Sequence, residues 1–283
     1  MHSELFQIGP LTLRAFGLCM ALGFLLGWQA AVWLCKRTGQ DADQLTSLLT
    51  WLMVSAVLGA RAAYVLEHWT AEFADRPLDI LRIDQGGLMF YGGLIAAAFV
   101  LALYARVYKK HLFQVTDLVL AVVPVGHAFG RLGCFMHGCC YGKITSSSIG
   151  VAFPSHSPAW WEQVSATPPL IAQTALASLP VIPTQLIEAA ANLILFIVLF
   201  RLYPQRCRQR GFITGCYLVS YSALRFGIEY LRGDPRLAVG PFSISQAISL
   251  GLLGLGLFCF AYARRAAPEG GARSQQPEVS SRN

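Results

Sequence analysis

Residues 114–135 read QVTDLVLAVVPVGHAFGRLGCF, a stretch that is apolar along most of its length. A helix of about 20 such residues is long enough to cross the hydrocarbon core of a bilayer. Six further stretches of similar length and composition occur, at roughly 13–35, 45–67, 88–107, 184–203, 211–231 and 242–263. The sequence therefore predicts an all-α membrane protein with about seven transmembrane helices.

The composition favours the same class. The chain has 283 residues, of which 55% are hydrophobic and 13% are charged, and its mean hydropathy is +0.50. A soluble domain typically has about 25% charged residues. No small-residue cleavage site follows the first apolar stretch, so we interpret it as a retained anchor and not as a signal peptide. We expect one polytopic domain over 1–265 and a disordered tail over 266–283, which is rich in Arg, Gly, Pro and Ser.

The net charge of +7 is distributed unevenly among the loops. By the positive-inside rule, the distribution places the N-terminus outside, the C-terminus in the cytoplasm and 136–183 in a small extracytoplasmic head. Topology and contact with anionic lipids account for the basic excess, so nucleic acid is not an expected partner. The cations that follow alternate apolar stretches are Lys36, Arg37, Arg106, Lys109, Lys110, Arg201, Arg206, Arg208, Arg210, Arg264 and Arg265.

Arg61, Arg131 and Arg225 lie inside apolar stretches or at their outer ends. A charge at that depth costs about 2.5–3.5 kcal/mol on insertion scales, so each must face a cavity or a partner. Side chains offset by three, four or seven residues share one face of a helix. That spacing places Gln185 beside Glu188, and groups Arg225 with Tyr221, Glu229 and Arg232.

Two interpretations of these charges remain open. Arg225 and Glu229 could simply neutralise each other across one helical turn. Alternatively, the three arginines exceed the available carboxylates, and the uncompensated positive charge binds an anion. At the outer leaflet the obvious anion is a lipid phosphate, which a guanidinium group binds through two parallel hydrogen bonds.

Glycines occur near the same ends of the apolar stretches as these arginines. The stretches GGLMFYGGLI at 86–95 and GARAAYV at 59–65 carry five of them. Small residues allow two helices to approach closely, which is the simpler interpretation. The functional interpretation is that they give a bulky headgroup access to the backbone.

A cluster of potential metal ligands follows Arg131. Cys134, His137, Cys139 and Cys140 lie within seven residues. Their spacing does not match a structural zinc site, which usually pairs two knuckles of the C-x2-4-C or H-x3-5-H type. A disulfide from Cys134 to either later cysteine is possible on the oxidising side. We expect no metal and no cofactor, and treat metal or redox function as the minor alternative.

Seven sequence blocks, in order, resemble the prolipoprotein diacylglyceryl transferase family. They are IGPLTLRAFG (8–17), GARAAYV (59–65), GGLMFYGGLI (86–95), FGRLGCFMHGCCYG (129–142), PTQLIEA (183–189), YSALRFGIEYLRGD (221–234) and SISQAISL (243–250). The resemblance implies a multi-pass enzyme of the bacterial cytoplasmic (inner) membrane. Its reaction would move diacylglycerol from phosphatidylglycerol to the lipobox cysteine in the signal peptide of a prolipoprotein.

The resemblance also implies roles for individual residues. Arg131 and Arg225 would flank the phospholipid headgroup, and Gly138 matches the family's glycine after the signature arginine. The candidates for catalysis are Arg131, Arg225, Tyr91 and Glu229. The candidates for binding phosphatidylglycerol are Arg131, Arg225, Arg61, Gly138, Tyr221, Arg232, Gln185 and Glu188.

This chain departs from the family pattern at four positions. Well-known members have asparagine where Cys134 stands, glutamate where Cys139 stands, tyrosine where Phe16 stands and histidine where Tyr91 stands. Tyr91 puts in doubt a mechanism that needs an imidazole base at that position. The base could be Tyr91, Glu229 or His127, or the acceptor cysteine could ionise in the positive field without one.

The chemistry itself explains the arginines. The acceptor thiol reacts as a thiolate, with an unperturbed pKa of about 8.5. The donor breaks a C–O bond and leaves glycerol-1-phosphate, so negative charge grows on the phosphate and pre-placed guanidinium groups stabilise it. Two other classes compete: a membrane thiol-redox or metal protein that uses the cysteine cluster, and a phospholipid-binding relative that has lost catalysis.

Overall fold

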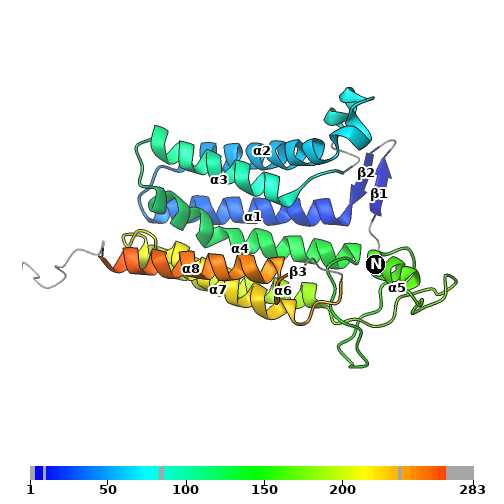
Figure 1. The fold of residues 1–283 in the computed structure, drawn as a ribbon. Coiled ribbons are helices and arrows are strands. Elements are labelled where there is room, and N and C mark those ends of the chain that lie inside the picture. The colour runs from blue at the N-terminus through cyan, green and yellow to red at the C-terminus, as the bar shows by residue number, and fades with distance from the viewer. Residues whose placement is uncertain (1–3, 9–10, 83–85, 235–237, 266–283) are drawn as a thin grey trace, which may run out of the picture.

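The computed structural model describes residues 4–8, 11–82, 86–234 and 238–265 (Figure 1). The predicted tail, 266–283, lies outside the described residues. Seven long helices lie side by side along one common direction, and a smaller extramembrane part caps one end. The long helices are α1 (Ala15–Arg37), α2 (Ala42–Glu67), α3 (Phe90–Val107), α4 (Leu112–His137), α6 (Thr184–Arg206), α7 (Phe212–Glu229) and α8 (Ile244–Arg265).

The short elements lie between the long helices. They include an eight-residue helix, a π-helical turn, a 3-10 turn and two antiparallel two-stranded hairpins, β1–β2 and β3–β4. The bounds are β1 Glu4–Ile8, β2 Leu11–Arg14, η1 Trp69–Phe73, η2 Pro77–Leu81, α5 Pro158–Ser165, β3 Ala238–Val239 and β4 Phe242–Ser243. Strands were not predicted from the sequence, because none of them is longer than five residues.

The predicted membrane class is confirmed. Within the described residues, six helices are long and apolar enough to cross a bilayer: α1, α2, α3, α4, α6 and α8. The seventh long helix, α7, has 18 residues and is less apolar because it carries Arg225, Glu229 and two tyrosines. Every predicted edge lies within three residues of an observed helix end. The number of helices that cross the membrane, and their direction, stay predictions.

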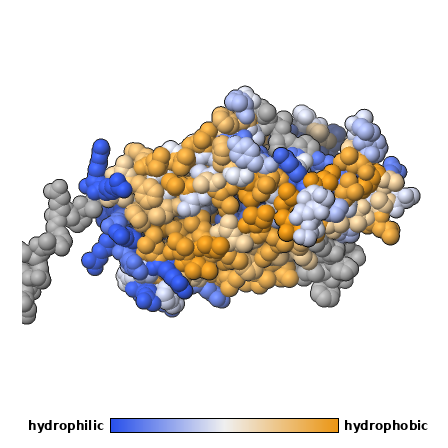
Figure 2. All heavy atoms as spheres, turned by 90° about the horizontal axis from the view of Figure 1, so that it is seen from below, coloured by the Kyte–Doolittle hydropathy of each residue, from blue (hydrophilic) through white to orange (hydrophobic). Residues whose placement is uncertain are grey.

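The surface agrees with a membrane environment. Figure 2 shows a broad hydrophobic band over the helices and a hydrophilic end. Cations occupy the last turns of α1, α3, α6 and α8, and these four helices all end at the same end of the bundle (Figure 1). Large apolar side chains such as Leu58, Phe99 and Phe258 are more than half exposed. Such a band is favourable when lipid, and not water, covers it.

Glycines bring α2 and α3 into close contact. A Cβ atom added at Gly59 would lie 2.4 Å from the Cβ atom of Ala96 and 2.6 Å from the carbonyl oxygen of Gly92. A Cβ atom added at Gly93 would lie 2.8 Å from the carbonyl oxygen of Ala56. The simpler interpretation of these glycines, close helix packing, therefore accounts for them.

A buried carboxylate fixes the end of the bundle opposite the cap. Asp117 on α4 is 1% exposed and accepts hydrogen bonds from the backbone N–H groups of Gly211 (2.7 Å) and Thr214 (2.8 Å). It also accepts one from the Thr214 hydroxyl at 2.6 Å. Because these donors would otherwise be unpaired at the start of α7, the contact ties α7 to α4. The arrangement sets the depth at which residues further along α7 meet α4.

Candidate active site

Four charged side chains from α4, α6 and α7 meet inside the bundle. Arg131 on α4 forms an ion pair through Nε with Glu188 on α6. Arg225 on α7 lies 3.7 Å from the other Glu188 oxygen and 3.1 Å from a carboxylate oxygen of Glu229, both measured from Nη1. We call Arg131, Glu188, Arg225 and Glu229 the arginine–glutamate cluster. Glu188 is its centre, because it faces both guanidinium groups.

The cluster is buried, and its charges balance. The side chains of Glu188 and Glu229 are 3% and 6% exposed, and those of Arg131 and Arg225 are 15% and 12% exposed. Each guanidinium group in the cluster faces a carboxylate, so the expectation of uncompensated positive charge was wrong for Arg131 and Arg225. It failed because Glu188 comes from another helix, and helix periodicity shows only partners on the same helix. The mutual neutralisation of Arg225 and Glu229 is confirmed.

Much hydrogen-bonding capacity in the cluster is unused. Among the described residues, the buried atoms without a hydrogen-bond partner include Arg225 Nη1, Glu188 Oε1 and both carboxylate oxygens of Glu229. The ion pairs of Arg225 are within 4 Å, yet they lack the alignment that a hydrogen bond needs. Buried polar atoms usually have partners, and unpaired ones are costly. Their convergence is typical of a site that completes its hydrogen bonds with a ligand.

Neighbouring side chains extend the cluster. The Arg225 guanidinium donates through Nη2 to the hydroxyl of Ser245 at 2.9 Å, which links α7 to the start of α8. The Tyr221 ring lies 5.2 Å from the ring of His127 and stacks with Tyr217 at 5.7 Å. Sequence reasoning missed Ser245 as a site residue, although it lies in the block SISQAISL that carried the family resemblance.

The loop after α4 is held against the start of α6. Gly138 ends α4 with a positive φ of 79°, a conformation that glycine adopts without a steric penalty. The amide of Gln185 donates to the carbonyl oxygen of Cys139 at 2.7 Å, and the hydroxyl of Thr184 donates to that of Cys140 at 2.9 Å. Gln185 therefore positions this loop, and only its buried Oε1 remains without a hydrogen bond among the described residues. The sequence analysis did not identify Thr184 as a site residue.

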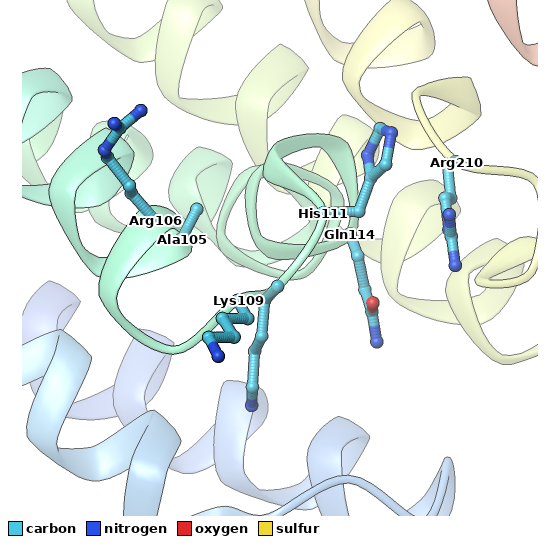
Figure 3. Close-up of a pocket in the computed structure, with 7 residues that line it drawn as sticks. Ala105, Arg106, Lys109, His111, Gln114 and Arg210 are labelled. Atoms are coloured by element: carbon cyan, nitrogen blue, oxygen red, sulfur yellow. The ribbon is translucent and has the colours of Figure 1, made fainter.

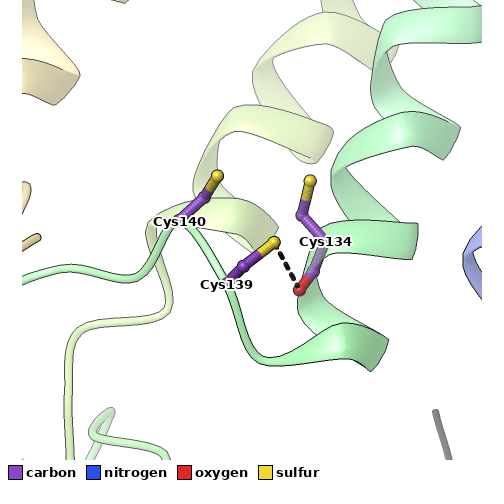
Figure 4. A group of neighbouring side chains, drawn as sticks. All are labelled: Cys134, Cys139 and Cys140. Atoms are coloured by element: carbon purple, nitrogen blue, oxygen red, sulfur yellow. Dashed lines mark hydrogen bonds between the residues drawn. The ribbon is translucent and has the colours of Figure 1, made fainter. Parts of the chain in front are cut away.

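Three cysteine side chains converge at this loop. The Sγ atoms of Cys134, Cys139 and Cys140 all lie within 4.8 Å of one another (Figure 4). Hydrogen bonds from the Cys134 and Cys139 thiols lower the pKa of Cys140, Arg232 and Arg131 lower it further, and burial opposes the change. We call these residues the cysteine trio. His137, which the sequence grouped with them, does not belong to it.

Arg232 lies beside the trio, just after α7. Its guanidinium group hydrogen-bonds both carboxylate oxygens of Asp234, with two distances of 2.7 Å, and it lies within electrostatic range of Cys140. Sequence reasoning placed Arg232 on the face of Arg225 and did not identify Asp234 as its partner. A bidentate contact of this kind fixes the plane of the guanidinium group.

Two predicted site residues lie apart from the cluster or at its edge. Arg61 on α2 is 7% exposed and donates five hydrogen bonds to backbone carbonyl oxygens between Asp79 and Gly87. This arginine therefore organises the connection between α2 and α3. Tyr91, in the first turn of α3, is 53% exposed and lies within electrostatic range of Tyr221.

An open pocket lies at the opposite end of the bundle. It has a volume of about 560 Å³ and is open and strongly basic, with residues from the α3–α4 and α6–α7 connections (Figure 3). The positive-inside rule alone predicts cations at this end of the bundle. No residue of the arginine–glutamate cluster lines this pocket. The lining residues are Ala105, Arg106, Lys109, Lys110, His111, Gln114 and Arg210.

The fold and the cluster together define a class of protein. Ionisable side chains buried between membrane-length helices make this cluster the candidate functional site of an integral membrane protein. Comparison with known sequences identifies the family. The profile of the prolipoprotein diacylglyceryl transferase family matches residues 3–262, and the chain belongs to this family.

Curated relatives agree with the assignment. The chain is 33% identical over 271 residues to the phosphatidylglycerol–prolipoprotein diacylglyceryl transferase of Xanthomonas oryzae pv. oryzae, with 92% of this chain and 90% of the relative covered. It is also 33% identical to proteins of the same name from Xanthomonas campestris pv. campestris and Pseudoalteromonas translucida. Those alignments cover 92% and 91% of this chain, and 90% and 92% of the relatives.

Proposed function

We propose that this protein transfers the diacylglyceryl group of phosphatidylglycerol to the lipobox cysteine thiol of a prolipoprotein, in the cytoplasmic membrane of a bacterium. The names of its relatives state this donor and this class of acceptor. The observation that carries the proposal is the arginine–glutamate cluster, whose buried polar atoms include several without hydrogen bonds among the described residues.

The arginines are suited to hold the phosphate of the donor. The ion pair of Arg131 with Glu188 runs through Nε, and among the described residues no hydrogen bond is found from its terminal nitrogens. Nη1 of Arg225 likewise has no hydrogen-bond partner. A phosphate between them accepts bidentate hydrogen bonds from planar guanidinium groups. Glu188 holds both groups in place before the lipid arrives, which keeps the cost of reorganisation low.

The reaction increases negative charge where these arginines point. The acceptor sulfur attacks the glycerol carbon, the C–O bond to phosphate breaks, and the phosphodiester becomes a phosphomonoester. The leaving group therefore gains charge in the transition state, and buried guanidinium groups stabilise that state more than the ground state. This role needs fixed positive charge and does not require Arg131 or Arg225 to transfer a proton.

Glu229 is the proton acceptor that the geometry favours. It is a buried carboxylate with both oxygens free of hydrogen bonds within the described structure, and it lies on the same side of α7 as Arg225. Tyr91 is a poorer candidate, because its side chain is 53% exposed and lies at the edge of the cluster.

A reconstituted assay tests the proposal. The purified protein, in nanodiscs that contain phosphatidylglycerol, receives a peptide with a lipobox cysteine, and mass spectrometry measures the peptide. We expect a gain of one diacylglyceryl group and release of glycerol phosphate, with no product from the same peptide carrying serine for cysteine. Binding of phosphatidylglycerol without product would contradict catalysis and favour a non-catalytic relative. Complementation of a bacterium depleted of its own transferase tests in cells whether the protein transfers diacylglycerol to lipoproteins.

A further inference from the structure

The cysteine trio has the geometry of a metal site. Zinc binds thiolate sulfur at about 2.3 Å, so tetrahedral coordination holds two sulfurs about 3.8 Å apart. The three Sγ atoms already lie within 4.8 Å of one another, so each needs to move by less than about 1 Å. In Figure 4, the side chains from the last turns of α4 and from the following loop point toward a common region.

The backbone holds this arrangement in place. Cys140 has a φ of 64°, which is uncommon for a residue other than glycine. Gln185 and Thr184 fix the carbonyl oxygens of Cys139 and Cys140, and the next residues pair with the chain at Ile182 and Leu231. An uncommon backbone conformation persists only where the surrounding structure holds it. These contacts therefore keep the three thiols in one arrangement.

The charges around the trio suit a bound zinc ion. Three thiolates and one Zn²⁺ carry a net charge of −1. Arg232 lies within electrostatic range of Cys140, and Arg131 lies within range of Cys140 and Cys134, so two guanidinium groups face this charge, although each is also paired with a carboxylate. In the described part of the chain, no histidine or carboxylate joins the three sulfurs as a fourth ligand. All three cysteines are partly exposed, so a fourth position is accessible.

We propose that Cys134, Cys139 and Cys140 bind one zinc ion whose fourth position takes the acceptor thiol of the substrate as a thiolate. The inference rests on the proposed function, because the acceptor there is a cysteine thiol. Zinc sites with three protein ligands and one open position are the catalytic type, and a thiol that coordinates zinc loses its proton. The site would thus supply the nucleophile next to the phosphate-binding arginines.

The step balances in atoms and charge. The S–H bond of the acceptor is replaced by a zinc–sulfur bond, and the proton passes to the Glu229 carboxylate. An electron pair on sulfur then forms the C–S bond to the glycerol carbon. The C–O bond breaks, and its electron pair leaves with glycerol phosphate. No oxidant or reductant takes part.

The spacing of the cysteines in the sequence does not match a structural zinc site, but the tertiary structure brings three of them together. A structural zinc site needs a second knuckle, but a catalytic site needs only three ligands. The left-handed turn at Gly138 folds Cys139 and Cys140 back toward Cys134, one turn before the end of α4. C-x2-H-x-C-C is therefore a three-thiol site with the histidine left out.

Metal binding is measured first, without reference to activity. The purified full-length protein is stripped with a chelator under reducing conditions and titrated with Zn²⁺ against a chromophoric chelator, and with Cd²⁺ for its thiolate charge-transfer absorption. We expect one metal ion per chain, lost in Cys134→Ser and Cys140→Ser and retained in Cys216→Ser, a matched control on α7. Arg232→Gln should weaken zinc binding about 10- to 100-fold, as expected for a residue that supports a ligand.

The acceptor peptide tests the open position. Adding a lipobox peptide to the cadmium-loaded protein should raise the thiolate absorption by the contribution of one further sulfur, and a serine peptide should leave it unchanged. An unchanged spectrum with the cysteine peptide would mean a closed, structural site and would overturn the inference. So would the absence of bound metal, whether the cysteines are then found as free thiols or as a Cys134 disulfide.

The transfer assay separates the two proposals. If the metal-free protein transfers diacylglycerol at the normal rate, the zinc proposal fails while the proposed function stands. If zinc and peptide bind as expected but phosphatidylglycerol yields no product, the proposed function fails. Transfer that is lost on stripping, restored by Zn²⁺ and absent in Cys140→Ser despite normal folding supports both.

Discussion

At the scale of single residues, Glu188 has the largest electrostatic role. It is 2% exposed and faces two guanidinium groups from different helices. Burying one ion pair gains little, because desolvation offsets the attraction, but removing one partner leaves an uncompensated buried charge. Glu188 therefore affects both the stability of the bundle and the position of the arginines.

Glu188→Gln should destabilise the protein more than a change at an exposed carboxylate. We expect a loss of about 3–5 kcal/mol, the usual cost of breaking a buried pair. Thermal unfolding in detergent measures the loss, and Glu72→Gln is the control, because Glu72 is exposed and its side chain, among the described residues, accepts a hydrogen bond only from the Tyr64 hydroxyl. Equal melting temperatures for the two variants would show that Glu188 does not balance the arginines.

Arg131→Ala and Arg225→Ala should each reduce transfer about 100- to 1000-fold, the typical cost of removing one group that stabilises developing charge. The peptide assay measures the rate, and circular dichroism checks the fold. Lysine should rescue poorly at both positions, because an ammonium group lacks the planar pair of donors. Near-normal activity of folded Arg131→Ala would contradict phosphate binding at this site.

Glu229→Gln should slow transfer about 100- to 10,000-fold, the range for loss of a general base. Tyr91→Phe should keep most of the activity, because the phenol is not the proton acceptor in this scheme. Raising the pH should partly restore Glu229→Gln, since the acceptor thiol then ionises without help. The opposite ranking of the two variants, measured over the same pH range, would assign the proton transfer to Tyr91.

At the scale of elements, helix pairs are set by contacts that only small or buried polar residues allow. Gly59 and Gly92 permit α2 and α3 to meet at backbone distance, and Asp117 binds the start of α7 to α4. Arg61 then holds the connection between α2 and α3 through five carbonyl oxygens. Polar contacts and close packing therefore hold these helices together. In lipid they replace the hydrophobic attraction that holds the helices of a soluble protein together.

Gly59→Ala should destabilise the protein by about 1–3 kcal/mol, the usual effect of overpacking, because the new methyl group meets backbone and Ala96. Gly251→Ala on α8 is the matched control, since nothing lies within 4 Å of its added Cβ atom. That substitution should be neutral or should stabilise the helix by up to about 1 kcal/mol. Differential scanning fluorimetry in the same detergent compares them, and a Gly59→Ala variant as stable as Gly251→Ala would contradict close packing.

At the scale of the whole molecule, the two ends of the bundle differ in charge and in chemistry. One end carries the basic last turns of α1, α3, α6 and α8 and the open basic pocket. The other carries the α4–α6 loop, the cysteine trio and the arginine–glutamate cluster. Positive charge on the cytoplasmic side would leave the active site near the outer leaflet.

Reporter fusions test this orientation. A cytoplasmic reporter should be active when fused after Lys110 or after Arg206, and an extracytoplasmic reporter should be active after Ser147. Each fusion is compared with its reciprocal reporter at the same residue, which controls for expression. A cytoplasmic location of Ser147 would reverse both the orientation and the proposed side of the acceptor.

The amino-acid sequence alone determined the membrane class, the helix ends to within three residues and the family. These follow from hydropathy along the chain and from local sequence blocks, so no distant contact is needed. It also placed Arg225 beside Glu229, because one helical turn separates them.

The tertiary structure alone decided which charges meet across helices. It pairs Arg131 with Glu188, and it places the Arg61 guanidinium group against backbone carbonyl oxygens. It also brings the sulfur atom of Cys134 close to those of Cys139 and Cys140. Such contacts depend on the rotation of each helix about its axis and on its depth relative to its neighbours. Those quantities are set by packing at sites such as Gly59 and Asp117, and local hydropathy carries no information about them.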